Sequence, residues 1–287
     1  MPTASDRIAW SRSLPFFAVH AAAIATPFLV PVEGRWIALA AALYAVRLFG
    51  ITAGYHRYFS HRAFRTSRAF QLVLAWLGAS SAQKGPLWWA AHHRDHHRYS
   101  DGPDDVHSPL DRGFWWSHVG WILATRHDET KLDRVKDLAR YPELRWLDRW
   151  HAVPPIVLGL VLFLAGGLPA FLWGFAVSTV FLWHGTFVIN SLAHVIGRRR
   201  YETGDGSRNS LALALVTFGE GWHNNHHFYA SAANQGFFWW EIDVTYYVLR
   251  GLATVGVVRE LRTPPPYVKY AHLAAPPTVA QDQAAGT

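Results

Sequence analysis

The chain has 287 residues, with 27 Lys and Arg, 20 Asp and Glu, a net charge of +7, 17 histidines and no cysteine. The absence of cysteine excludes disulfide frameworks, zinc ribbons, thiolate-bound iron–sulfur clusters and cysteine nucleophiles, so any bound metal must have nitrogen and oxygen ligands. Mean hydropathy is only +0.03, yet charged residues are missing from some stretches and concentrated in others. This segregation is typical of a membrane protein.

Two apolar stretches near the N-terminus predict a helical hairpin. Residues 14–32 contain no charged side chain over the length that a bilayer core requires, and residues 36–54 are similar apart from Arg47. The few residues between them leave room only for a tight turn outside the membrane. A cleaved signal peptide is the alternative for the first stretch, but no small-residue cleavage site follows it and a second span begins at once.

Three further apolar segments follow along the chain. Residues 70–81 are too few to span a membrane and predict an interfacial or re-entrant helix. Residues 152–168 and 170–189 predict a second hairpin, because a glycine pair and Pro169 separate two uncharged stretches with no room for a domain between them.

The C-terminal part is less apolar. Residues 237–258 contain two acids and an arginine, so we predict an amphipathic helix at the membrane interface rather than a fifth crossing. Three consecutive prolines end regular structure, and residues 264–287 are predicted to be a disordered tail. Residues 1–263 then form one domain. The predicted fold class is an all-α polytopic membrane protein with four transmembrane helices in two hairpins and a cytoplasmic helical cap.

Charge distribution indicates the orientation. The hairpins place the N-terminus, residues 55–151 and everything after residue 190 on one side of the membrane. All but two of the 27 Lys and Arg lie on that side, the exceptions being Arg35 in a turn and Arg47 within a span. The positive-inside rule makes this side cytoplasmic. The net positive charge is therefore explained by side chains that face the cytoplasm and the anionic lipid headgroups there. We expect no nucleic-acid partner.

Nine of the 17 histidines fall into groups with the spacing of metal ligands. They are His56 and His61 in HRYFSH, His93, His96 and His97 in HRDHH, His194 in NSLAH, and His223, His226 and His227 in HNNHH. On a helix the positions i, i+3 and i+4 share one face, so each HxxHH is expected to direct three imidazoles toward one point. His56 and His61 depart from this spacing and diverge by about 140° on a regular α-helix. Either the helix breaks there, or the two side chains reach different metal ions.

All four groups lie near the cytoplasmic ends of the predicted spans, so they can converge. One metal ion binds four to six ligands, so nine histidines suit a site with two metal ions. Imidazole ligands without thiolate fit Fe, Zn, Cu or Ni. Soluble di-iron bundles need Glu-x-x-His twice, and this chain has it once, from Glu220 to His223. The catalytic zinc site of a hydrolase uses three protein ligands, so this class of enzyme does not explain nine histidines. The other eight histidines are interpreted as ordinary polar or interfacial side chains: His20, His92, His107, His118, His127, His151, His184 and His272.

The position of the site narrows the chemistry. A metal pair at the bilayer surface suits a lipid whose tail enters the protein while its head stays near water. A reaction on such a tail would have to attack an unactivated methylene, which no side-chain acid or base can do. It therefore requires an oxidant made from dioxygen and two electrons.

The motifs resemble those of a known family, the membrane fatty acid desaturases of the stearoyl-type Δ9 class. HRYFSH, HRDHH and HNNHH resemble its three histidine boxes, NSLAH resembles its Asn-Ser-x-x-His element, and GFWWSHVGWIL at residues 113–123 also matches. The resemblance covers about residues 14–262. It implies a histidine-bound di-iron centre that uses O2 and two electrons to introduce a cis double bond, at Δ9, into a saturated acyl chain.

By this resemblance the nine grouped histidines are iron ligands, and Asn190 reaches one iron through water. No catalytic residue stands apart from the metal ligands. Gln83, Trp89 and Thr186 occupy the positions that line the bend of the family's acyl tunnel. The nearby carboxylates that are candidates for holding imidazole tautomers are Glu220, Asp95, Asp101, Asp104, Asp105 and Asp243.

The acyl carrier and the electron donor stay open. Ala91 stands where animal acyl-CoA members carry an arginine that contacts CoA, and the surrounding WWAAHHRDHHRYSD is more similar to bacterial and cyanobacterial members. The substrate is therefore an acyl-CoA or an acyl-lipid. With no room for a fused redox domain, electrons are expected from a separate ferredoxin- or cytochrome-type protein. The arginines at residues 198–200 either meet an acidic donor or anchor the chain at the membrane. We expect a protein of the bacterial inner membrane with both termini and the site cytoplasmic.

Two alternatives remain. A membrane di-iron lipid hydroxylase or other oxygenase would share the histidine motifs but form a different product. A metal-transporting or metal-sensing membrane protein would place its ligands within the spans or in loose histidine-rich loops, and the nine histidines follow neither pattern.

Overall fold

A computed structural model describes residues 6–273 of the chain. Helices dominate, and two short strands form the one sheet within these residues. The first elements are α1 (Trp10–Leu29), α2 (Gly34–Phe49), η2 (Gly50–Ser60), β1 (Arg65–Thr66), α3 (Arg68–Ser80), α4 (Pro86–Tyr99), α5 (Pro109–Arg112), η3 (Trp116–Gly120), α6 (Trp121–Leu123), η4 (Thr125–His127), η5 (Leu132–Val135), α7 (Lys136–Ala139) and α8 (Pro142–Arg149). They are followed by α9 (Val153–Phe171), η6 (Leu172–Val177), α10 (Ser178–Ser191), η7 (Leu192–His194), α11 (Leu211–Val216), α12 (His223–Phe228), α13 (Val244–Thr254), β2 (Val258–Arg259), α14 (Pro266–Lys269) and η8 (Ala271–Leu273).

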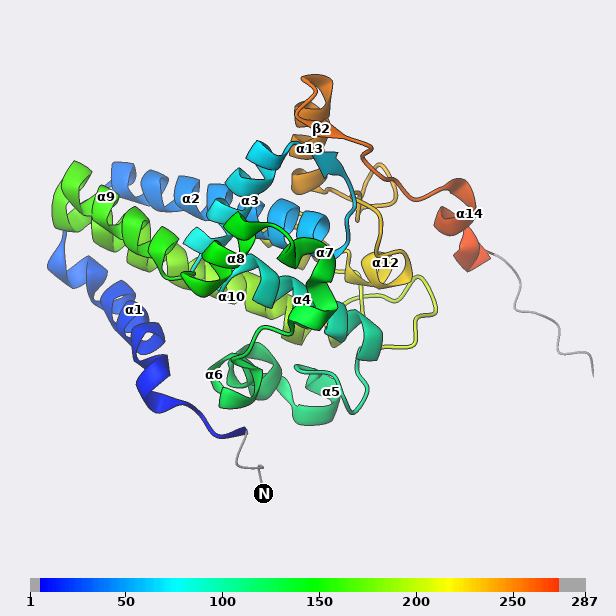
Figure 1. Cartoon of the computed structure of the whole chain (residues 1–287), viewed down its shortest axis with the longest axis horizontal. Coiled ribbons are helices and arrows are strands. Elements are labelled where there is room, and N and C mark those ends of the chain that lie inside the picture. Colours follow the sequence, from blue (N-terminus) through cyan, green and yellow to red (C-terminus); the bar gives the residue numbers. More distant parts are fainter. Residues whose placement is uncertain (1–5, 274–287) are drawn as a thin grey trace, which may run out of the picture.

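The first two helices form the N-terminal hairpin, drawn in blue in Figure 1. α2 begins shortly after α1 ends and continues without interruption into η2, so that one helical stretch runs from Gly34 to Ser60. The helix therefore extends beyond the predicted span 36–54, and its last turn carries the first histidine group.

α9, η6 and α10 form the second hairpin. α9 is interrupted at Gly166 and Gly167, where Gly167 has φ +63° and ψ −158°, a conformation that glycine adopts readily. Beyond this break the chain runs back along itself, because the ring of Phe171 lies where a Cβ atom on Gly159 would come within 3.2 Å of it. The reversal falls where the glycine pair predicts it (Figure 1).

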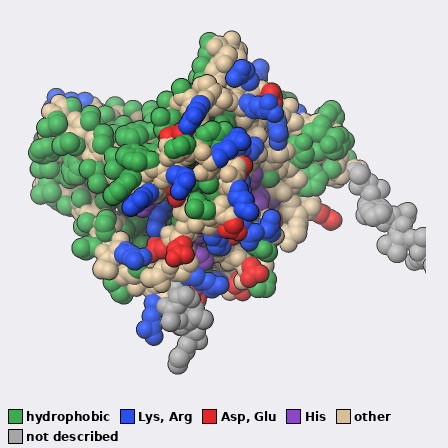
Figure 2. Space-filling model, in the orientation of Figure 1, with side chains coloured by type: hydrophobic (Ala, Val, Ile, Leu, Met, Phe, Trp, Pro, Cys, Tyr) green, Lys and Arg blue, Asp and Glu red, His purple; other side chains and the backbone are tan. Residues whose placement is uncertain are grey.

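One end of the molecule has an apolar surface. By length and composition, two helical stretches of the described chain are able to cross a membrane, Gly34–Ser60 and Val153–His194, and the second is the doubled-back hairpin. Phe28 is 84% exposed on α1, Leu164 75% on α9 and Phe181 67% on α10. Figure 2 shows hydrophobic side chains covering this end, whereas Lys and Arg gather over the rest of the face. Exposed apolar area of this extent is expected of a surface that contacts lipid.

Polar side chains inside the hairpins have partners in neighbouring helices. Arg47, which is 1% exposed, donates to the Thr179 hydroxyl at 2.8 Å. His20 and His184 meet through their Nε2 atoms at 3.2 Å, and Nδ1 of His184 contacts Nε2 of His118 at 2.9 Å. These three imidazoles join α1, α10 and η3, as expected of polar groups in an apolar environment.

The cap around the inner ends of the hairpins is helical apart from one minimal ribbon. β1 pairs antiparallel with β2, with Thr66 opposite Val258, and the Thr66 hydroxyl donates to the Val257 carbonyl at 2.7 Å. The interfacial segment predicted at residues 70–81 is α3, and α13 is shorter than the predicted helix at 237–258. The all-α prediction holds for the fold and misses the ribbon, which is too short to produce a strand pattern.

The C-terminal segment is ordered further than predicted. The sequence predicts that the disordered tail begins at residue 264, but α14 and η8 lie within residues 264–273, and Val268 is only 5% exposed. The Tyr201 hydroxyl donates to the Lys269 carbonyl at 2.8 Å. The proline run made the local composition resemble a tail, whereas tertiary contacts order it. Residues 274–287 lie outside the described residues.

Candidate metal centre

The first histidine group lies at the end of η2. The amide of His61 donates to the carbonyl of His56, five residues earlier, at 3.3 Å, which is the hydrogen-bond pattern of a π-helix. Residues five apart then lie nearly above one another, and the two rings are 4.9 Å apart between centroids. Of the two alternatives predicted from the sequence, the first holds, because the helix departs from α-helical geometry here and both side chains belong to one group.

The second group lies on α4, whose N-terminus is capped by another helix. Oδ1 of Asp148 on α8 accepts the amide protons of Leu87 at 3.0 Å and Trp88 at 2.8 Å, satisfying donors that a helix cannot pair internally. Arg94, inside HRDHH, donates to the carbonyl of Ser60 at 3.1 Å. The residue between the histidines therefore ties α4 to the end of η2.

The third group lies on α12, which its own asparagines hold in place. Oδ1 of Asn224 accepts the backbone amides of Arg200 and Tyr201, each at 2.8 Å. The Asn225 amide donates to the Gln235 carbonyl at 2.9 Å. Both asparagines are 0% exposed. Sequence reasoning assigned no role to these asparagines, and they explain how a helix of 6 residues presents three imidazoles in fixed directions.

The nine histidines assemble into two adjacent groups. The first group contains His56, His61, His93, His97 and His226, and the second contains His96, His194, His223 and His227. Within each group the candidate ligand atoms all lie within 4.8 Å of one another. The groups are in contact, since the rings of His97 and His227 stack with centroids 4.4 Å apart.

Each HxxHH motif divides between the two groups. His93 and His97 belong to the first, while His96 belongs to the second. In HNNHH the outer pair belongs to the second group and His226 to the first. Positions i and i+4 stay together, whereas i+3 and i+4 differ by about 100° in direction. The prediction of one meeting point for each motif is therefore wrong, and two points fit the prediction of a dinuclear site.

The spacing of the ring nitrogens fits metal ligation. The Nε2 atom of His226 lies 3.0 Å from that of His56 and 2.9 Å from that of His97, and the Nε2 atoms of His194 and His223 are 3.0 Å apart. With metal–nitrogen bonds of about 2.0–2.1 Å, adjacent ligands lie about 2.9 Å apart at a right angle and about 3.4 Å apart at a tetrahedral angle. The observed spacing is therefore short enough for neighbouring rings to bind one ion.

Carboxylates hold four of the imidazoles through Nδ1. The pairs are His194 with Asp101 at 2.8 Å, His227 with Asp205 at 2.7 Å, His96 with Asp105 at 3.1 Å, and His56 with Glu220. A carboxylate that accepts the Nδ1 proton leaves the lone pair on Nε2, where a metal ion can use it. Nε2 of His227 is buried without a hydrogen-bond partner among the described residues, as expected of a ligand atom.

Sequence reasoning found three of these four carboxylates. Asp95 and Asp243 pair with basic side chains instead, and Asp104 is exposed. Asp205 was missed, because only its position between NSLAH and HNNHH distinguishes it in the sequence. His107, interpreted as an ordinary side chain, also reaches the site, and its ring centroid lies 4.3 Å from that of His96.

Electrostatics keep most of the imidazoles neutral. Burial, and then the neighbouring imidazoles, hold the pKa of five rings well below the usual value: His61, His93, His97, His223 and His226. Burial lowers the pKa of His227 to about 4 despite the nearby Asp205. Burial also opposes ionisation of Asp101, but the hydrogen bond from His194 lowers the pKa of that carboxyl to about 2. Neutral imidazoles backed by ionised carboxylates are the donor set that divalent metal ions require.

Asn190 lies near histidines of both groups, since His56 and His93 line the same small cavity. It is on α10, four residues before His194, and lines a cavity of about 40 Å³ together with His96 and His223. A cavity of this size, with imidazole and amide side chains on its wall, has space for a water molecule.

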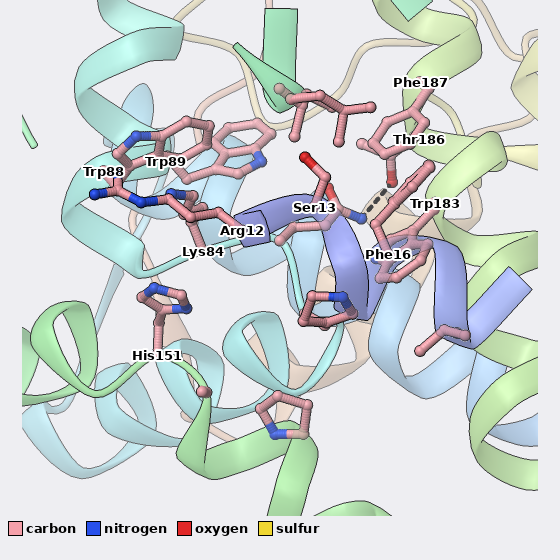
Figure 3. A pocket seen from close by; sticks show the side chains of 18 of the residues that line it. Arg12, Ser13, Phe16, Lys84, Trp88, Trp89, His151, Trp183, Thr186 and Phe187 are labelled. Carbon is pink, nitrogen blue, oxygen red and sulfur yellow. Dashed lines mark hydrogen bonds between the residues drawn. The ribbon is translucent and has the colours of Figure 1, made fainter. Parts of the chain in front are cut away.

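A much larger cavity reaches the same place from the apolar end. It has a volume of about 1310 Å³ and is lined by α1, α4, α9 and α10. Gln83, Trp89 and Thr186 lie on its wall, and Figure 3 shows Trp89 and Thr186 there. The Gln83 amide donates to the Thr186 hydroxyl at 3.0 Å, and Trp89 stacks on His93 with centroids 4.9 Å apart. Trp89 and Thr186 also line the small cavity. The three residues therefore surround the place where the large cavity meets the histidines.

Replacing Asp205 by asparagine tests the carboxylate that sequence reasoning missed. The amide cannot hold the Nδ1 proton of His227 as a carboxylate does, so we expect metal affinity or activity to fall about 10–100-fold. Iron content and turnover of the purified variant measure this effect. Asp104→Asn, an exposed residue from the same set of candidates, should match the wild type. Equal losses in both variants would contradict the role of Asp205.

Comparison with known proteins agrees with this geometry. The family model described as fatty acid desaturase matches residues 34–254. The chain is 38% identical to an sn-2 palmitoyl-lipid 9-desaturase of Nostoc sp. (strain 36), over 91% of this chain and 93% of that protein. It is 35% identical to an sn-1 stearoyl-lipid 9-desaturase of Anabaena variabilis, over 89% and 94%. It is 36% identical to an icosanoyl-CoA 5-desaturase of Limnanthes douglasii, over 88% and 72%.

The chain belongs to the fatty acid desaturase family. It is an oxidoreductase that desaturates fatty acyl chains.

Proposed function

We propose that the chain introduces a cis double bond at Δ9 into a saturated acyl chain, using two iron ions, O2 and two electrons from an external donor. The observation that carries the proposal is the meeting of a long apolar cavity with two adjacent groups of imidazoles. Two 9-desaturases among the relatives support the position of the double bond. The reaction removes two hydrogens from the acyl chain and, with two electrons and two protons, reduces O2 to two waters.

The nine histidines are proposed to hold the irons in the two groups described above, with Asn190 reaching the second through water. When bound, the iron pair supplies the oxidising power that an unactivated methylene requires. Imidazole ligands without thiolate suit iron among other metals, and the family to which the chain belongs supports iron here.

Reconstitution with ⁵⁷Fe under anaerobic conditions tests this assignment. Mössbauer spectra should show two nitrogen- and oxygen-ligated irons per chain. Because nitrogen-rich sites also take zinc when a protein is overproduced, the preparation should be stripped of metal first. Saturation at one iron per chain would contradict the dinuclear site.

The chain's own residues are proposed to orient the substrate and exclude water. Apolar side chains of α1, α9 and α10 surround the acyl chain, and the Gln83–Thr186 hydrogen bond closes one side of the bend. Trp89, stacked on His93, forms the wall next to the first group. These contacts fix which methylenes face the metal site, which is how positioning contributes to rate and selectivity.

Changes at this bend should alter the product. Thr186→Phe narrows the cavity, and Trp89→Ala widens it, so we expect a shift in chain-length preference or double-bond position by at least one carbon pair. Gas chromatography with mass spectrometry of derivatised products reads both. Phe181→Trp, on the exposed face of the same helix, should leave the profile unchanged. Identical profiles in all variants would remove these residues from the tunnel.

We propose four crossings, by α1, α2 and the two arms of the α9–α10 hairpin, in a bacterial inner membrane with the metal centre cytoplasmic. Exposed apolar side chains on α1, α9 and α10 support the crossings, and the cationic surface away from them supports the orientation.

Figure 2 shows histidine side chains visible between Lys and Arg on that surface, which suits docking of an acidic ferredoxin- or cytochrome-type donor. Arg200 is engaged by Glu241, so Arg198 and Arg199 are the members of this cluster available to a donor.

A further inference from the structure

The cap carries an exposed aromatic surface at the end of the molecule opposite the glycine break of α9, where α14 lies (Figure 1). The exposed side chains of this aromatic surface are Trp239, Trp240, Tyr267, Tyr270 and Leu273. Phe238 holds them together, because its ring stacks on Trp240 with centroids 4.8 Å apart and contacts Tyr270 at 5.9 Å. Figure 2 shows hydrophobic side chains at this end of the face as well. Exposed rings that lie away from the apolar hairpins mark a contact with another molecule.

Free cations border the aromatic surface. Lys269 lies on α14. Arg199 directly precedes Arg200, whose guanidinium lies 4.6 Å from the ring centroid of Phe238. Arg200 is paired with Glu241, but no carboxylate pairs with Arg199 or Lys269 in the part of the chain that the structure describes. Protein interfaces commonly place aromatic side chains at the centre and polar ones at the rim, and cations at the rim attract an acidic partner. The surface therefore suits a protein that presents acidic side chains around an apolar patch.

A chain of contacting rings leads from this surface to the second histidine group. On the surface side, the ring of His272 lies 6.1 Å from that of Phe238 and 5.5 Å from that of Tyr201 between centroids. Tyr201 is buried and lies almost parallel to Phe228, with centroids 4.3 Å apart and an angle of 6° between the planes. Phe228 directly follows His227, a member of the second group. The rings therefore bridge the interior between the aromatic surface and the candidate metal ligands.

The aromatic contact of the first histidine group leads elsewhere. Trp89 stacks on His93, but it lies on the wall of the large cavity, where the acyl chain is proposed to lie. Beyond Trp89, the ring of Tyr55 lies at 5.8 Å and is 0% exposed. A protein outside the chain cannot reach this contact without displacing the substrate. The route through Phe228 stays clear of the cavity wall, so it can be used while substrate is bound.

We propose that the aromatic surface is the docking site of the electron donor, a small protein with an acidic face, and that electrons reach the second histidine group through Tyr201 and Phe228. The inference rests on the proposed function, because it assigns a place to the donor that this reaction requires. Each docking event transfers one electron and leaves the donor oxidised. Two such electrons, with the two taken from the acyl chain, reduce O2 to two waters.

The docking site is tested by donor-driven turnover of the holoenzyme in nanodiscs, with a reduced plant-type ferredoxin and a reduced soluble b-type cytochrome as the two probes. Trp239 is 87% exposed, and Trp239→Ser should raise the KM for the probe that serves the wild type at least about tenfold, the scale of an interface hot spot. Trp115→Ser is the matched control, because Trp115 is 76% exposed and lies outside the aromatic surface. Raising the ionic strength should raise the wild-type KM, since screening weakens contacts between charges.

The route is tested by Phe228→Leu, which keeps an apolar side chain beside His227 but removes the ring. Reduction at saturating donor should slow, while the KM for the donor stays at the wild-type value. The measured quantity is the ratio of the donor-driven rate to the rate with dithionite and methyl viologen, because this ratio cancels any change in metal content. Stopped-flow absorbance of the donor under anaerobic conditions gives the first rate. Phe228→Tyr keeps the ring and should restore the ratio.

The two electron sources separate the docking site from the proposed function. An unchanged KM in Trp239→Ser overturns the docking site, and an unchanged ratio in Phe228→Leu overturns the route, while the desaturase function stands in both cases. The docking site is also overturned if neither probe supports turnover of a wild type that dithionite supports. A changed oligomeric state of Trp239→Ser with an unchanged KM would show that the surface binds a second copy instead. No desaturation with any of these electron sources would overturn the proposed function itself.

Discussion

Replacing His226 by alanine is expected to lower desaturation by more than about 1000-fold, the scale on which loss of an essential catalytic group acts. Its Nε2 atom lies 3.0 Å from that of His56 and 2.9 Å from that of His97, so it stands at the centre of the first group. In the proposed centre, its removal would take one ligand from the ion of the first group. Turnover and iron content of the purified variant are the measurements, and both should fall.

The control for this variant is His272→Ala. His272 is an exposed histidine whose Nδ1 bonds to the Lys269 carbonyl at 3.0 Å, away from the metal centre. It should retain wild-type turnover and iron content. Substantial desaturation by His226→Ala in a correctly inserted protein would remove His226 from the ligand set.

Replacing Arg57 by glutamine is expected to destabilise the protein by about 3–5 kcal/mol, because breaking a buried ion pair leaves uncompensated charge. Arg57 lies inside the first histidine motif and is 1% exposed. Its guanidinium donates to Glu220 at 3.0 Å and to Asp243 at 3.0 Å. Thermal unfolding of the protein in detergent should show Tm lowered by about 10 °C. Iron content should fall as well, because Glu220 also holds His56.

Arg65→Gln is the matched control for Arg57. Arg65 pairs with Glu260, but the two side chains are 73% and 60% exposed, and exposed pairs contribute little to stability. Its Tm should stay within about 2 °C of wild type. A similar Tm for both variants would show that Arg57 is not a stabilising link between the first and third histidine motifs.

The sequence predicts which histidines come together, but it does not predict how they divide into two groups. Spacing alone identifies nine histidines that the structure brings together. It does not identify which histidine belongs to which group, because helical spacing places i+3 on the same broad face as i and i+4, and only tertiary packing decides which ion each ring faces. The π-helical hydrogen bond between His56 and His61 likewise has no signature in hydrophobic periodicity.

The supporting residues are the part that sequence patterns reveal least. Asp205 comes from a loop and meets His227 only after the chain has folded. The two asparagines of HNNHH and Arg94 of HRDHH lie between the histidines, yet their hydrogen bonds fix the helices that carry the imidazoles. The helical hairpins were easier to predict, since an uncharged stretch and a glycine pair are local features.

Product analysis tests the central claim most directly. The chain is expressed in a host that lacks unsaturated fatty acids, and membrane lipids are examined by mass spectrometry with and without oxygen. The account predicts cis monounsaturated acyl chains with the double bond at C9, formed only in the presence of oxygen and absent with His226→Ala. A hydroxylated acyl chain with no new double bond would contradict it.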